Sequence, residues 1–206
     1  MDLLERTKEL CRLYDIKPAR SKGQNFLIEE KIYDDIAAAA ELKTDDAVLE
    51  VGPGLGFLTS KLAKIAGRVI AVELDDKLAE ILRTGIIAQG INNVEVINEN
   101  VLDFKLRPPL AKGGFKIVAN LPYNITSIFL RKFLSETDIK PELMVLMLQK
   151  EVAERICASP REIPTFGRDA KRISRGKAGA MSLLALSVQF YAKPEIVEIV
   201  KKENFW

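Results

Sequence analysis

The chain has 206 residues, 48% of them hydrophobic and 29% charged, which suits one compact globular domain. It contains no histidine, so its chemistry must do without the usual general base and the usual transition-metal ligand. The formal net charge of +2 excludes a polycation, and no apolar run approaches the ~20 residues of a membrane span.

The N-terminal segment is charged and amphipathic, and its apolar spacing predicts a short helix over residues 2–14. It lacks the apolar centre of a signal peptide. The two cysteines, Cys11 and Cys157, are far apart and match no metal spacing. Free thiols and a cytoplasmic location are therefore expected.

A basic loop over residues 17–27 places Gln24 and Asn25 before the apolar pair Phe26-Leu27. One interpretation is the entry to a helix, with Asn25 as its N-cap. The other is a cofactor lid, since side-chain amides can bond a carboxylate or a sugar edge. The loop alone does not decide between them.

Residues 48–56, V-L-E-V-G-P-G-L-G, indicate a strand, a tight turn and a helix. Gly52, Gly54 and Gly56 let the backbone approach a ligand closely, although such glycines can also serve a turn alone. A second strand over 68–73 ends in Glu73, placed to accept hydrogen bonds from both hydroxyls of a ribose. The spacing G-P-G-L-G departs from the dinucleotide fingerprint. With the preceding Glu50 it is similar to motif I of S-adenosylmethionine (SAM) methyltransferases.

The rest of the chain alternates strands and helices, with Gly67 as the C′ residue of the first crossover helix. Further strands are predicted over residues 93–97, 115–119, 143–148, 185–191 and 195–200, and helices over 32–42, 57–66, 75–84, 127–134 and 149–157. This order predicts an α/β fold with a doubly wound, mostly parallel sheet and helices on both faces. Ligands bind at the carboxyl ends of such strands, where Gly52, Glu73, Asn100 and Asn120 all fall.

The tip of the strand over 115–119 reads Asn120-Leu121-Pro122-Tyr123. The Asn120 amide oxygen and the Leu121 carbonyl could accept the two N–H groups of an exocyclic base amine, and Pro122 fixes the backbone between them. Tyr123 offers a face for stacking, and the base must be unpaired or flipped out to reach it. The same tetrapeptide could instead be an ordinary strand-end turn.

Six ordered motifs resemble those of the ribosomal RNA adenine N6,N6-dimethyltransferases (the KsgA group), which are related to the Erm resistance methyltransferases. They read S-K-G-Q-N-F-L, E-V-G-P-G-L-G, A-V-E-L-D, V-L-D-F, A-N-L-P-Y-N-I and L-M-L-Q-K-E-V-A-E-R-I. The resemblance covers about residues 17–158 and 181–206. It implies a Rossmann-like SAM-dependent methyltransferase that adds two methyl groups to N6 of adjacent adenosines in small-subunit rRNA during ribosome assembly.

The resemblance also implies a set of site residues. Those expected to bind SAM are Gln24, Asn25, Leu27, Glu50, Gly52, Gly54, Glu73, Leu74, Asn100, Val101 and Asn120. Those expected to hold the target adenine are Asn120, Leu121, Pro122, Tyr123 and Phe205. Small-subunit rRNA or the pre-ribosomal small subunit is the expected partner of a monomeric protein without metal.

Three departures from the family pattern stand out. The family usually has Asp at position 100, whereas Asn100 can still accept from an adenine amine, with weaker binding expected. Residues 161–178 form a basic insertion, in which 161–177 hold six basic and two acidic side chains. This insertion suits either RNA contact or a solvated loop. The resemblance implies that the family's small C-terminal helical domain is absent after Trp206, so residues 1–206 are expected to be a catalytic domain and a truncated chain.

Two other functions stay open. One is an Erm-like enzyme acting on large-subunit rRNA, although Asn120-Leu121 favours the small-subunit group. The other is a non-catalytic rRNA-binding or assembly factor on the same fold, against which intact Glu73, Asn120 and Tyr123 argue.

Overall fold

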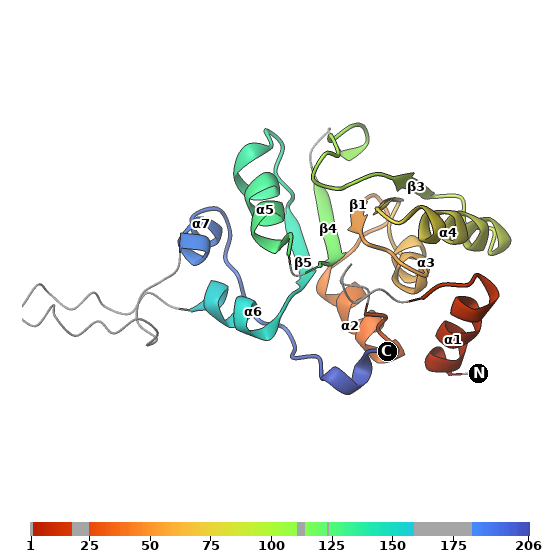
Figure 1. The fold of residues 1–206 in the computed structure, drawn as a ribbon. Helices are drawn as coiled ribbons and strands as arrows, with labels where there is room; N and C mark the ends of the chain where they lie inside the picture. Colours follow the sequence, from red (N-terminus) through yellow and green to blue (C-terminus); the bar gives the residue numbers. More distant parts are fainter. Residues whose placement is uncertain (1, 18–24, 111–113, 123, 159–182) are drawn as a thin grey trace, which may run out of the picture.

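The centre of the molecule is a parallel five-stranded sheet in the order β3-β2-β1-β4-β5 (Figure 1). The computed structural model describes residues 2–17, 25–110, 114–122, 124–158 and 183–206. The strands are β1 Ala47–Val51, β2 Arg68–Glu73, β3 Val94–Asn98, β4 Phe115–Asn120 and β5 Leu143–Met147. The chain order reverses between β1 and β4, so the carboxyl ends of these two strands form the switch point at which ligands bind in doubly wound sheets. The predicted doubly wound parallel sheet is confirmed.

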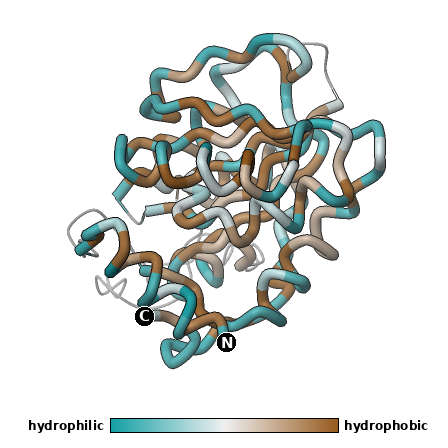
Figure 2. The backbone as a smooth tube through the Cα atoms, turned by 90° about the vertical axis from the view of Figure 1, so that its right-hand side faces the viewer, coloured by the Kyte–Doolittle hydropathy of each residue, from teal (hydrophilic) through white to brown (hydrophobic). Residues whose placement is uncertain are grey.

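Helices connect the strands and cover both faces of the sheet (Figure 1). They are α1 Leu3–Leu13, α2 Glu30–Ala39, α3 Phe57–Ala63, α4 Asp76–Ala88, α5 Thr126–Arg131, α6 Lys150–Cys157 and α7 Leu183–Tyr191, with a π-helical turn η3 Lys132–Glu136 and a 3₁₀ turn η5 Lys202–Asn204. Figure 2 shows the hydrophobic colour along the central strands and hydrophilic residues at many of the turns. No helix in the described part of the chain is long and apolar enough to cross a bilayer.

Side chains of β1 alternate between the two faces of the sheet, as the period of a strand requires. Leu49 and Val51 join a core that α5 and η3 complete with Phe129 and Phe133. Val48 joins the opposite core, beneath α2 and α3. Glu50 is two residues after Val48, so its side chain lies on the same face of the sheet. The Glu50 carboxyl group therefore projects beneath α2 and α3, where an apolar residue would be expected.

Several predicted helix ends are wrong; α2, for example, ends at Ala39 and not at Leu42. The helix α3 ends at Ala63 with Lys64 as its C-cap, so Gly67 is not its C′ residue, and Gly67 does not adopt a left-handed conformation. A Cβ atom at Gly67 would lie 2.5 Å from the Thr44 carbonyl oxygen, so close backbone approach is the reason for this glycine. The helix α4 continues past the predicted Thr84 to Ala88.

The prediction of strands over 185–191 and 195–200 is also wrong. Residues 183–191 form α7, and 192–201 have no regular secondary structure. In the helix, Ala185 and Val188 lie three residues apart and pack on α6 and on α5. The Gln189 amide also donates to the carbonyls of Ile156 (2.6 Å) and Ala158 (3.0 Å), which helps to cap α6. The basic insertion 161–178 lies outside the described residues.

Candidate functional site

An open cleft of about 1930 Å³ lies at the carboxyl ends of the strands and extends along β5. The sequence-predicted residues that line it are Asn25, Leu27, Glu50, Gly52, Gly54, Glu73, Leu74, Asn100, Val101, Asn120, Pro122 and Phe205. Leu121 does not line the cleft. Gln24 and Tyr123 fall outside the described residues. The fold thus gathers residues from the whole length of the chain around one cavity.

The glycine turn after β1 brings backbone rather than side chain to the cleft. Gly52 and Gly54 adopt φ values of 68° and 58°, which L side chains rarely accept. The Gly52 N–H donates to the Val72 carbonyl at 3.0 Å, which fixes the turn to β2. A Cβ atom at Gly52 would lie 3.5 Å from the Asn120 carbonyl oxygen, so any side chain here would project between the tips of β1 and β4.

The carboxylate of Glu73 organises the tip of β2. One of its oxygens accepts from the Gly54 N–H and the other from the Asp75 N–H, each at 3.0 Å. Glu73 is 7% exposed, and burial raises its pKa while these N–H groups oppose the rise. A carboxylate has about four acceptor positions. The Leu74 N–H also lies close enough to lower the Glu73 pKa, and the remaining acceptor capacity is open to ligand hydroxyls, beside Leu74, which is 68% exposed.

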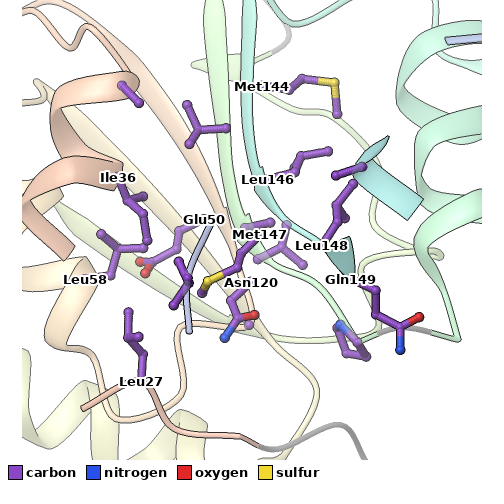
Figure 3. A pocket seen from close by; sticks show the side chains of 18 of the residues that line it. Leu27, Ile36, Glu50, Leu58, Asn120, Met144, Leu146, Met147, Leu148 and Gln149 are labelled. Carbon is purple, nitrogen blue, oxygen red and sulfur yellow. The ribbon is translucent and has the colours of Figure 1, made fainter. Parts of the chain in front are cut away.

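Glu50 is 1% exposed, and neither of its oxygens has a hydrogen-bond partner among the described residues. Burial raises its pKa to about 8, and the negative charge of Glu73 adds to the rise. The Thr59 hydroxyl opposes part of this rise, although its geometry falls short of a hydrogen bond. In Figure 3 the carboxyl group points toward Ile36 and Leu58, away from the side of β5. A buried polar group without a partner is the kind of feature that a ligand can satisfy.

The turn after β3 presents Asn100 and Val101. The Asn100 amide oxygen accepts from the Leu102 N–H at 3.0 Å, and its backbone carbonyl accepts from the Asp103 N–H at 2.9 Å. One acceptor position of the amide oxygen and both amide N–H donors of Asn100 are thus left for a ligand.

Asn120 ends β4 opposite Met147 of β5, and its side chain lies between Glu50 and Gln149 in Figure 3. The Leu121 side chain is 2% exposed and belongs to the core. Its N–H donates to the Met147 carbonyl at 3.3 Å, so only its own carbonyl can face a ligand. The Pro122 carbonyl accepts from the Ile125 N–H at 3.2 Å, which turns the chain into α5.

Phe205 reaches the site from the far end of the sequence. It forms an isolated antiparallel bridge with Leu27, and the Trp206 N–H donates to the Phe26 carbonyl at 2.8 Å. The rings of Phe26 and Trp206 stack with centroids 6.5 Å apart. Asn25 and Leu27 therefore line the cleft as part of this bridge, and Asn25 does not cap a helix, because α2 begins at Glu30 with Glu29 as its N-cap.

Three further residues support the site and were not predicted. The Tyr33 hydroxyl donates to the Leu27 carbonyl at 3.0 Å, and burial together with the Glu50 charge raises the Tyr33 pKa. Thr59 lies beside Glu50, and Lys132 binds carbonyls of the turn after Asn100. The spacing of α2 and α3 indicated buried faces, but nothing in it distinguished these polar side chains. In the described part of the chain, no group of three or more acidic, Cys or His residues is placed to hold a metal ion.

The site fits an adenosine-containing cofactor in three respects. The glycine turn leaves a cradle that a Cβ would fill, Glu73 keeps acceptor capacity for hydroxyls, and the buried Glu50 carboxyl lacks a partner among the residues that the structure describes. Together with the sheet order, these features define a Rossmann-like methyltransferase fold.

Two solved structures share this fold. A dimethyladenosine transferase from Plasmodium falciparum has a TM-score of 0.58 at 34% identity, over 64% of this chain and 46% of that one. The 23S rRNA methyltransferase ErmE has a TM-score of 0.57 at 37% identity, over 64% and 50%.

Residues 17–164 match a family model described as "Ribosomal RNA adenine dimethylase", and the chain belongs to this family. A curated relative from Dehalococcoides mccartyi (strain CBDB1), named "Ribosomal RNA small subunit methyltransferase A", is 44% identical over 99% of this chain. One of the same name from Clostridioides difficile (strain 630) is 38% identical over 97%. The chain spans 63% and 64% of the lengths of these two relatives. The resemblance drawn from the six motifs is confirmed.

Proposed function

We propose that residues 1–206 are the catalytic domain of an rRNA adenine dimethyltransferase, which transfers methyl groups from SAM to N6 of adjacent adenosines in small-subunit rRNA. The observation that carries this proposal is the position of Asn120, beside Gly52 and in the same cleft as Glu73. A methyl acceptor held at Asn120 would lie next to a nucleoside held at Glu73. The names of the curated relatives support the small subunit as the source of the rRNA.

In this proposal the cofactor supplies an electrophilic methyl group, and the chain supplies the position of each partner. Glu73 would accept from the ribose hydroxyls, Asn100 and Val101 would contact the adenine, and Asn25, Leu27 and Gly54 would close the site around the cofactor. Leu74 would offer an apolar surface. Glu50 would face the methionine end, where its buried carboxyl could gain a partner.

The exocyclic amine of adenine is a weak nucleophile because its lone pair is delocalised into the ring. The Asn120 amide oxygen and the Leu121 carbonyl would accept its two N–H groups and hold the nitrogen toward the methyl group. Tyr123 and Phe205 would stack on the base, which must be unpaired or flipped out. No strong base is needed, since the proton can pass to water, and positioning supplies most of the rate. This fits a chain without histidine.

The wider biology belongs to the same proposal. The protein would act as a monomer in the cytoplasm, and its partner would be the pre-ribosomal small subunit. The basic residues 161–178 would contact RNA. A second candidate is an Erm-like enzyme for large-subunit rRNA, which the similarity to ErmE at 37% identity favours.

The deciding experiment measures methyl transfer from labelled SAM to undermodified small and large ribosomal subunits, followed by nucleoside mass spectrometry. Dimethyladenosine in the small subunit alone would support the proposal. Product in the large subunit would favour the Erm-like enzyme. If neither subunit is methylated while SAM still binds in a parallel titration, the chain acts as a non-catalytic factor or as a cofactor-binding part of an enzyme.

A further inference from the structure

Lys132 makes an unusual set of contacts at the edge of the cleft. It is the first residue of the π-helical turn η3, directly after α5. Its ammonium group donates to the carbonyls of Val101 (3.1 Å), Leu102 (2.6 Å) and Phe104 (2.6 Å). An ammonium group has three N–H donors, so these three carbonyls use all of them.

The same turn is held from its other side by Asn100. The Asp103 and Phe104 N–H groups donate to the Asn100 carbonyl at 2.9 and 3.1 Å, and the Leu102 N–H donates to the Asn100 side chain. Lys132 thus donates hydrogen bonds to carbonyl groups of the turn, and Asn100 accepts hydrogen bonds from its N–H groups. Because these polar groups are all paired, the conformation of the turn depends on both side chains.

Lys132 follows an apolar helix, at the start of the π-helical turn. Phe129 and Phe133 are both fully buried, and their ring centroids lie 4.7 Å apart. Residues four apart share one face of a helix, so both rings lie in the core, while the ammonium group of Lys132 reaches the turn after β3. Single π turns inside helices are frequent at functional sites.

Lys132 also joins two parts of the site. The helix α5 begins just beyond Asn120 and Pro122, and the turn held by Lys132 carries Asn100 and Val101. One side chain therefore connects the element that follows the acceptor motif to the turn expected to contact adenine.

We infer that Lys132 is a positioning residue for cofactor recognition, which fixes the turn bearing Asn100 and Val101 and so sets the preference for adenine over other purines. This inference rests on the proposed function. Its mechanism is indirect, since all three ammonium donors are committed to the turn. Loss of the ammonium group frees three carbonyls and lets Asn100 move from the adenine edge.

The test compares the binding of S-adenosylhomocysteine and its 6-deamino analogue, in which unsubstituted purine replaces adenine, by calorimetry. Unsubstituted purine lacks the exocyclic amine, so it has no donor for the Asn100 amide oxygen, and it offers the Asn100 amide N–H groups no carbonyl in place of the amine. In the wild type we expect the adenosyl compound to bind roughly tenfold more tightly or better, a factor that corresponds to about 1.4 kcal/mol. In Lys132→Met this ratio should fall to near one, chiefly through weaker binding of the adenosyl compound.

Two further variants make the result specific. Lys132→Arg retains the charge and several donors, and should restore most of the ratio. Lys116→Met is the matched control, because the Lys116 ammonium group also binds a backbone carbonyl: Lys116 is buried, donates to the Glu41 carbonyl at 2.5 Å and pairs with Asp46 at 2.9 Å. It lies near the opposite end of β4, so its loss should lower stability and leave the ratio unchanged.

A wild-type ratio in Lys132→Met would overturn the inference and leave the proposed function standing. Failure of the wild-type chain to bind either compound would overturn the proposed function, and this inference with it. If Lys132→Met does not fold, Lys132→Gln replaces it, since its amide has two donors for three carbonyls and should also lower the ratio.

Discussion

Glu50 is a carboxylic acid in a position suited to an apolar side chain. Strand alternation places it beneath α2 and α3, where Val48 precedes it in the same core. A buried charge without a partner is costly, so the group remains neutral until its pKa of about 8 is reached. The folded protein therefore holds a proton that the unfolded chain releases.

The first prediction concerns stability against pH. The Glu50 carboxyl has an ordinary pKa of 4.5, which applies to the unfolded chain, and one of about 8 in the fold. Between these values the folded state binds more protons, so stability is greatest below the lower value and falls as pH rises toward the upper one, by at most about 1.4 kcal/mol per pH unit. Glu50→Gln removes the carboxyl group and with it this loss of stability at rising pH. The free energy of unfolding of this variant should therefore rise relative to wild type between pH 5 and pH 8, as urea titrations would measure.

The exposed Glu151→Gln is the control, since it makes the same change of side chain at the surface. It should follow the wild-type curve. Parallel curves for Glu50→Gln and the wild type would show that the Glu50 carboxyl ionises normally in the folded protein.

The second prediction concerns the acceptor. Asn120→Ala removes the amide oxygen proposed to hold the adenine amine and leaves Glu73 with the glycine turn intact. Methyl transfer should fall by at least about 100-fold, in the range seen when an orienting donor or acceptor is removed. The affinity for SAM should change little, although Asn120 is also expected to contact the cofactor, because the contacts of Glu73 and of the glycine turn remain. Asn92→Ala, an exposed site just before β3, should alter neither quantity. Equal loss of transfer and binding would contradict the assignment of Asn120 to the acceptor.

Among the elements, the glycines show how one residue type serves different physical needs. Gly67 avoids a clash, because a Cβ there would lie 2.5 Å from the Thr44 backbone oxygen. Gly85 lies inside α4, where the nearest atom to a Cβ is 4.0 Å away, on the flexible side chain of Gln89. The first glycine is required by packing, whereas the second only weakens a helix.

The third prediction follows from this contrast. Gly67→Ala should destabilise the protein by about 1–3 kcal/mol, because a rigid backbone atom must move. Gly85→Ala should stabilise it by about 0.5–1 kcal/mol, the difference between the two residues in a helix. Urea unfolding midpoints measure both effects. The affinity for S-adenosylhomocysteine should be the same in both variants, since neither glycine lines the cleft. Shifts of the same sign would contradict the prediction.

The sequence predicted the elements wherever a pattern was sustained. The alternation of strands and helices from residue 47 to 157 predicted the sheet, because buried parallel strands and amphipathic helices differ in period. It did not predict α7, because the run over 183–191 is apolar on nearly every side, so its periodicity is weak. The helix is determined by contacts with α5 and α6, distant in sequence, and by the Gln189 bonds to the end of α6.

The sequence predicted the site residues at the ends of strands but not the polar residues that support them. Gly52, Glu73 and Asn120 could be placed together because each lies at the carboxyl end of a predicted strand, and the carboxyl ends of parallel strands lie at one edge of the sheet. Tyr33, Thr59 and Lys132 could not, because each acts by contacting an element far away in sequence. A polar side chain on an apolar helix face has the same pattern whether it is solvated or buried against a carbonyl.

In the whole molecule, the last residues of the sequence pair with a segment near the start of the chain, at the edge of the cleft. The segment with Phe205 and Trp206 pairs with residues 26–28, so segments far apart in the sequence share one edge of the site. The Phe26 N–H donates to the Trp206 carbonyl at 3.1 Å and the Ile28 N–H to the Asn204 carbonyl at 2.8 Å. Residues 192–201 connect this bridge to α7 without regular structure. The order of residues 25–28 therefore depends on the far end of the chain.

The last prediction tests this dependence. Trp206→Ala removes the ring stacked on Phe26 and retains the backbone bonds, so about 1 kcal/mol of local stability should be lost. Amide hydrogen exchange at Phe26 and Ile28 should then become roughly fivefold faster, while amides of β1 and β4 remain unchanged. Because Asn25 and Leu27 line the cleft, the affinity for S-adenosylhomocysteine should fall in parallel. Trp206→Phe keeps an aromatic ring and should preserve both protection and affinity. Unchanged exchange at Phe26 in Trp206→Ala would show that residues 25–28 are ordered without this contact, and any loss of affinity would then need another cause.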